Sequence, residues 1–187
     1  MSAAIWGLLW QASCETLYMI GVSGLLACLG GLPLGVVLAV TAPGGLMPRP
    51  WLSQLLGFVV NAARSTPFII LMVAIIPFTR LIVGRSIGTT AAIVPLALAA
   101  LPFMARLVEG ALNEVDDGVV EAAQAMGASP GRIVLKVLFP EAVPALLRGV
   151  TLMLVNLVGY SAMAGAVGGS GSTTRSEERR VGKECRS

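Results

Sequence analysis

The sequence contains no histidine and only three cysteines, which are Cys14, Cys28 and Cys185. These cysteines are too widely spaced to form a C-x-x-C ligand pair, so the chain does not supply the ligands of a zinc-type site. A phosphate loop of the G-x-x-x-x-G-K-[ST] kind and a nucleophile–base set are also missing. We therefore expect no catalytic residue, no metal and no cofactor, and we expect ATP to be neither bound nor hydrolysed by this chain.

Charge is scarce as well. Charged residues make up 12% of the 187 residues, hydrophobic residues make up 56%, and the mean hydropathy is +0.84. A soluble domain of this size needs a polar exterior that this composition does not supply. Much of the net charge of +3 lies in the last residues, which leaves a nearly neutral main body and no basis for a nucleic-acid partner. The composition predicts an all-α membrane protein.

Four apolar stretches are long enough to cross a bilayer. The first, 16–40, has no charged residue, and as a helix it would be about 37 Å long. It lacks a basic segment before it and a cleavage site after it, so we expect a permanent span. The others are predicted at about 57–79, 86–112 and 145–169. The second contains Arg64, whose long stem can reach the headgroups, and Arg106 is expected to pair with Glu109 near the end of the third.

The basic residues predict how the spans are oriented. Alternating spans place the turn at 41–50 and the region 106–148 on the same side of the membrane. That side collects six basic residues, Arg49, Arg64, Arg106, Arg132, Lys136 and Arg148, whereas the other side receives Arg80 and Arg85. Because basic loops stay in the cytoplasm, we expect 106–148 inside and the N-terminus outside.

The cytoplasmic loop 118–139 has the pattern of two short helices with a break between them. Gly127 suits the position just after a helix, Ser129 suits an N-cap, and Pro130 suits the first residue of a new helix. The first helix has a face of small apolar residues beside Glu121, which suits a helix seated in the groove of a partner. An ordinary interfacial loop without a partner is the alternative.

This loop resembles the EAA loop of bacterial ABC importer permeases. The pattern E-A-A-x3-G-x9-I-x-L-P is met at Glu121, Ala122, Ala123, Gly127 and Pro140, and Val137 and Phe139 replace its Ile and Leu. Over residues 1–169 the chain is similar to the methionine uptake branch of these permeases. The stretches "NAARSTPFIILMVAIIPFTRLIVG" and "VNLVGYSAMAGAVGG" carry this similarity most clearly.

The resemblance implies a transmembrane helical bundle that forms a homodimer in the bacterial inner membrane. Separate cytoplasmic ATP-binding subunits would take up the 118–128 helix, and a periplasmic or lipoprotein substrate-binding protein would dock outside. The family implies five spans where four are found here. After Gly169 the sequence changes to polar residues of mixed charge without apolar periodicity, so we interpret 170–187 as a non-native or disordered tail that follows a truncated permease domain, 1–169.

Polar and sulfur-containing side chains in the fourth span are candidates for the translocation pathway. They are Asn156, Tyr160, Ser161 and Met163. Polar groups are expensive in lipid unless they turn inward, so this face is expected to border a pathway or to pack against another helix. Three functional alternatives remain: a permease for another amino acid, an ion-coupled secondary transporter, and a membrane scaffold without a transport role.

Overall fold

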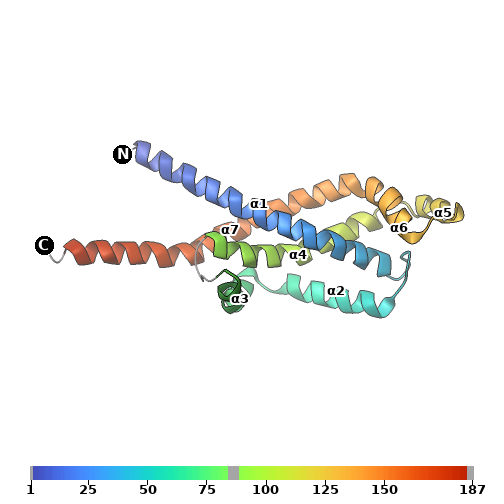
Figure 1. Cartoon of the computed structure of the whole chain (residues 1–187), viewed down its shortest axis with the longest axis horizontal. Helices are drawn as coiled ribbons and strands as arrows, with labels where there is room; N and C mark the ends of the chain where they lie inside the picture. Colours follow the sequence, from blue (N-terminus) through green and yellow to red (C-terminus); the bar gives the residue numbers. More distant parts are fainter. Residues whose placement is uncertain (1, 84–88, 185–187) are drawn as a thin grey trace.

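The fold is an elongated bundle of helices, seen in a computed structural model that describes residues 2–83 and 89–184 (Figure 1). Three long helices dominate: α1 (Ser2–Thr41), α4 (Thr89–Asn113) and α7 (Phe139–Glu184). The shorter elements are α2 (Pro50–Ser65), α3 (Phe68–Val83), α5 (Asp117–Ala125), α6 (Pro130–Ile133) and a π-helical turn, η1 (Val134–Leu138). No strand occurs in these ranges, which confirms the all-α prediction for the described part of the chain.

Among the described residues, three stretches are long and apolar enough to cross a membrane: Trp10–Thr41, Ala91–Asn113 and Pro130–Gly165. A bent pair of helices, Pro50–Ser65 and Phe68–Thr79, gives a fourth if the pair is counted as one span.

The two ends of the bundle are formed by different elements. α5, α6 and the turn between α1 and α2 lie at one end, and the start of α1 and the end of α7 lie at the other (Figure 1).

The stretch predicted as one continuous span at 57–79 is broken in the structure. The chain bends by 104° between α2 and α3. The cause lies in Pro67, which has no N–H for a helical hydrogen bond and disfavours helical geometry in the residue before it. Thr66 is accordingly extended, with φ −76° and ψ 124°. The hydroxyls of Ser65 and Thr66 donate to the carbonyls of Asn61 and Ala62 and so satisfy the end of α2.

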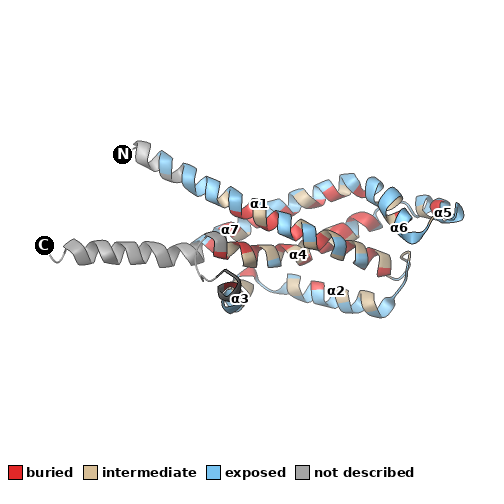
Figure 2. Cartoon of the chain, in the orientation of Figure 1, coloured by how far each residue is buried: buried red, intermediate tan, exposed pale blue. Residues whose placement is uncertain are grey.

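α1 and α4 pack together closely because α1 presents small residues to α4. Ser23, Ala27, Gly31 and Gly35 recur every four residues, which places them on one face of α1. A Cβ on Gly35 would lie 2.5 Å from the carbonyl oxygen of Ala105, and Ser23 and Ala27 are fully buried. Small residues at this spacing let helix backbones approach in a membrane. Figure 2 shows buried residues concentrated where α1, α4 and α7 meet.

The last long helix begins earlier and ends later than the sequence indicates. The predicted span at 145–169 is the middle of a helical stretch that starts at Pro130 and passes through α6 and η1 into α7. The backbone of α7 continues to Glu184. Residues 170–184 are therefore helical in the structure, whereas the sequence interpretation allowed a disordered tail.

Candidate functional site

The helix α5 follows α4 after a turn of three residues and has an N-cap of its own. Asp116 is the N-cap residue, and its Oδ1 accepts a hydrogen bond from the backbone N–H of Gly118 at 2.7 Å. Asp117 adds a negative charge to the first turn, where the helix dipole is positive. An isolated helix of nine residues has little stability in water, so the N-cap bond and the charge of Asp117 help to stabilise α5.

The end of α5 confirms the position predicted for Gly127. This glycine has φ +75°, which is the left-handed conformation that glycine adopts at little cost. Its N–H donates to the carbonyl of Gln124 at 2.9 Å, and the N–H of Ala128 donates to the carbonyl of Ala123 at 3.1 Å. These two bonds form a Schellman motif, so the helix stops sharply after Met126.

The motif residues divide between the two faces of α5. Glu121 and Ala122 are exposed, whereas Ala123 is buried. α5 packs against η1 and α6, and the side chain of its C-cap residue Met126 is 80% exposed. α5 is therefore a capped helix with one face packed against the bundle and the other exposed. We call it the peg, because its exposed face can fit into the groove of a partner.

The segment after α5 also follows the predicted order. Ser129 is the N-cap residue of α6 and Pro130 is at its start, although the Ser129 side chain makes no capping bond and its carbonyl accepts from Arg132 and Ile133 instead. Ile133 is buried. Pro140, the last motif residue, lies in the first turn of α7, directly after the π-helical turn η1.

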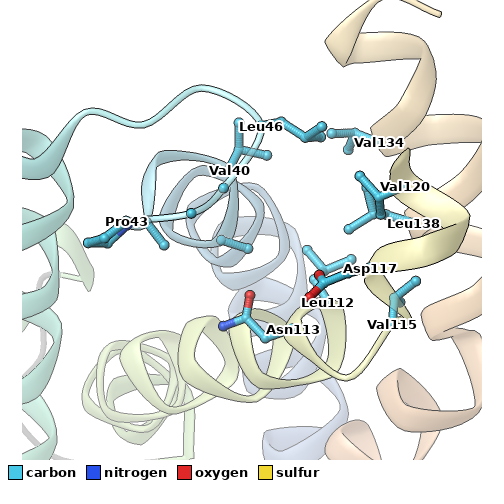
Figure 3. A pocket seen from close by; sticks show the side chains of 14 residues that line it. Val40, Pro43, Leu46, Leu112, Asn113, Val115, Asp117, Val120, Val134 and Leu138 are labelled. Carbon is cyan, nitrogen blue, oxygen red and sulfur yellow. The ribbon is translucent and has the colours of Figure 1, made fainter. Parts of the chain in front are cut away.

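A pocket of about 340 Å³ lies at the base of α5 (Figure 3). It is bounded by the end of α1 and its following turn, the end of α4, α5 and η1. Figure 3 shows apolar side chains from four of these elements converging on it, among them Val40, Leu112, Val120, Val134 and Leu138. The pocket therefore separates part of α5 from the α1–α2 turn.

The structure does not keep the four candidate pathway residues together. Asn156, Tyr160 and Met163 share one side of α7, and Asn156 and Met163 are exposed. Ser161 points into the core instead, because its side chain is 5% exposed and its hydroxyl donates to the Val158 carbonyl. The Asn156 amide donates to the Leu152 carbonyl in its own helix. Ser161 is therefore buried in the single chain, unlike Asn156 and Met163.

Tyr160 contacts a residue that the sequence analysis did not select. Its ring stacks on the ring of Phe68, with centroids 4.6 Å apart and planes 10° apart. Phe68 is the first residue of α3, so the break at Pro67 directs α3 toward α7. No signal in the sequence pairs these two residues, because they belong to helices that are far apart along the chain.

Two arginines join α2 to α4. Arg106 pairs with Glu109 at 2.6 Å, as the i, i+3 spacing predicts, and its Nη2 also donates to the Gly57 carbonyl of α2 at 3.0 Å. From the other direction, Arg64 of α2 lies over the ring of Phe103 at 5.4 Å from its centroid.

In the part of the chain that the structure describes, no cluster of three His, Cys, Asp or Glu side chains is placed to hold a metal ion.

Comparison with known families and proteins gives consistent matches. The family model "Binding-protein-dependent transport system inner membrane component" matches residues 31–180. A probable D-methionine transport system permease protein MetI from Vibrio cholerae is 58% identical over 164 residues, which are 88% of this chain and 73% of the relative. MetI from Escherichia coli K12 is 53% identical over 165 residues, covering 88% of this chain and 76% of the relative.

Solved structures agree with these relatives. A chain of the MetNI methionine ABC transporter in an inward-facing conformation has a TM-score of 0.87 and 54% sequence identity, covering 90% of this chain and 78% of that chain. An amino acid ABC transporter solved with histidines has a TM-score of 0.61 at 18% identity, with 86% of this chain and 75% of that chain covered. The second similarity shows the fold alone.

Proposed function

Because this chain belongs to the family of binding-protein-dependent transport system inner membrane components, we propose that it is the membrane permease of an ATP-driven methionine importer. Methionine is supported as the substrate by 58% identity to a probable D-methionine permease together with a TM-score of 0.87 to a chain of a methionine ABC transporter. Identity of this level over most of both chains supports a shared substrate, which the side chains alone do not encode.

The coupling site of this permease is the exposed face of α5. Glu121 and Ala122 are open to a partner, and Gly127 ends the helix sharply. A carboxylate on a short peg accepts hydrogen bonds from a groove, and the small side chain beside it permits close approach. We assign this face to a cytoplasmic ATP-binding subunit, which leaves this chain non-catalytic.

The assembly contains two copies of this chain, two ATP-binding subunits and an external substrate-binding protein. Closure of the ATP-binding subunits moves the two α5 helices, and the helical bundles rock between inward-open and outward-open arrangements. Rigid-body alternation of this kind needs a firm connection between the peg and the spans. Here α5 packs on η1, which continues into α7, and α5 follows α4 after the short turn.

Asn156, Tyr160 and Met163 are the pathway side of α7 in this proposal. Two of them are exposed in the single chain, and a second copy would cover such a face. The flexible thioether of Met163 suits an apolar constriction that opens and closes.

The α5 end of the bundle lies in the cytoplasm and the start of α1 lies outside. The basic residues support this orientation, since Arg49, Arg132 and Arg148 all belong to the α5 end. Ser2 lies ahead of the apolar stretch Trp10–Thr41, so a cysteine placed there reports on the orientation directly. In a Ser2→Cys chain whose Cys14, Cys28 and Cys185 are replaced by serine, a membrane-impermeant maleimide should label position 2 in intact cells. Labelling that requires permeabilised cells would reverse the orientation.

Uptake in proteoliposomes tests the function itself. The chain is reconstituted with its ATP-binding subunit and its binding protein, and labelled methionine inside the vesicles is measured with ATP and with a non-hydrolysable analogue. We expect uptake with ATP that unlabelled methionine competes away. Uptake competed only by a different amino acid would replace the substrate, and uptake driven by an ion gradient without ATP would favour a secondary transporter.

A further inference from the structure

The two arginine contacts between α2 and α4 are reciprocal. Gly57 and Arg64 are seven residues apart, about two helical turns, so they share a face of α2. Phe103 and Arg106 are three residues apart and share a face of α4. Arg106 reaches from α4 to the Gly57 carbonyl, and Arg64 reaches from α2 to the Phe103 ring.

Arg106 is the stronger of the two contacts. Its side chain is 24% exposed and that of Glu109 is 15% exposed, so the ion pair is shielded from water. A charged donor to a backbone carbonyl in such a site forms a strong hydrogen bond. Gly57 provides the room, because a Cβ there would lie 3.3 Å from Nη2 of Arg106.

The same guanidinium is not fully satisfied. Its Nε is buried and has no hydrogen-bond partner among the described residues. A buried polar atom without a partner costs stability. The other two guanidinium nitrogens hold acceptors on two different helices, Glu109 of α4 and the Gly57 carbonyl of α2.

We propose that Arg106 is a positioning residue that fastens α2 to α4, so that movement of α5 reaches the candidate pathway. This inference rests on the proposed transport function. α4 leads into α5, and Arg106 passes its displacement to α2. α2 ends at the Pro67 break, and the next residue, Phe68, stacks on Tyr160 of α7. The permease then turns ATP-driven movement of the peg into movement at Tyr160.

The test compares Arg106→Gln with Arg148→Gln in the full complex reconstituted in proteoliposomes. Arg148 pairs with Glu114 at 3.2 Å, but both side chains are mostly exposed at 72% and 65%, so it is a matched arginine with a weak contact. The number of methionine molecules imported per ATP hydrolysed should fall by about tenfold for Arg106→Gln, since a hydrogen bond to a charged group is lost. It should be unchanged for Arg148→Gln.

Two further variants separate transmission from simple stability. Arg106→Lys keeps the charge and should restore the ratio in part, because one ammonium replaces the planar fork poorly. The double variant Arg106→Glu with Glu109→Arg keeps an ion pair at i, i+3 and loses the donor to Gly57, so it should stay uncoupled. Full coupling in this exchanged pair, or in Arg106→Gln, would overturn the proposal.

A readout that does not use transport distinguishes this inference from the proposed function. Amide hydrogen exchange in α2 should be faster in Arg106→Gln than in Arg148→Gln within the assembled complex, with exchange in α1 unchanged. If the unsubstituted complex imports no methionine, the proposed function fails while this comparison still tests the fastening. Equal exchange in α2 for the two variants would refute it.

Discussion

The rings of Phe68 and Tyr160 lie stacked, with their centroids 4.6 Å apart, at the point where the first residue of α3 meets α7. Phe68 is buried and Tyr160 is half-buried, so the pair closes a contact between two helices that are far apart in the sequence. The contact depends on the break at Pro67, because a straight helix through 57–79 would carry Phe68 in another direction.

Removing one ring of this pair should weaken the bundle and disturb transport. Tyr160→Ala loses a stacked aromatic pair, worth about 1 kcal/mol beyond the area that it buries. We expect a lower melting temperature in detergent and slower methionine uptake, while Tyr160→Phe keeps both near their original values. Phe78→Ala is the control, because Phe78 is an exposed aromatic residue of the same α3 helix. Equal effects at Phe78 and Tyr160 would contradict a specific role for the stack.

The packing of α1 on α4 predicts a steep response to added volume at Gly35. A Cβ there would lie 2.5 Å from both the Ala105 carbonyl oxygen and the Val108 Cβ. Because one of these atoms belongs to the backbone, the clash is relieved only if the helices move apart. Gly35→Ala should therefore destabilise the protein by about 1–3 kcal/mol in an unfolding titration. Gly21→Ala in the same helix meets nothing within 4 Å and should be neutral or stabilising. Similar unfolding curves for the two variants would show that this contact is looser than described.

The features that could be predicted from the sequence are those set by residues close together along the chain. The end of α5 at Gly127 and the start of α6 at Pro130 were predictable because caps depend on a few neighbouring residues. The Arg106–Glu109 pair was predictable for the same reason, since three residues of helix bring the side chains together. Each of these features is set within about one helical turn.

Features that depend on direction or on distant partners were not predictable in this way. The stretch 57–79 was predicted as one span because apolarity does not report the course of the backbone. Pro67 marked a possible break, but it did not give the direction in which the chain continues. Ser161 was grouped with Tyr160 by its polarity, whereas its position around the helix turns it into the core. The Phe68–Tyr160 stack and the Arg106–Gly57 bond need knowledge of which helices are neighbours.

The Schellman motif predicts that Gly127 is the sensitive glycine of the coupling loop. Gly127→Ala places a Cβ in the left-handed conformation at φ +75°, which costs about 1–2 kcal/mol. α5 should fray at its end, and less ATP-binding subunit should co-purify with the permease. Gly131→Ala, in the neighbouring α6 helix with nothing within 4 Å, should leave co-purification unchanged. A loss that is equal in both variants would point to general damage to the loop and not to the cap.

The coupling role that we propose for α5 predicts that Glu121 matters for the partner and not for the fold. Glu121 is exposed, and alanine is the best helix former, so Glu121→Ala should not lower the melting temperature of the permease. If a partner donates hydrogen bonds to this carboxylate, its loss should weaken binding of the ATP-binding subunit by about tenfold in a titration. Gln124→Ala is the matched control, because Gln124 is an exposed polar residue of the same helix. Binding that is unaffected by Glu121→Ala would exclude this face of the peg as the contact.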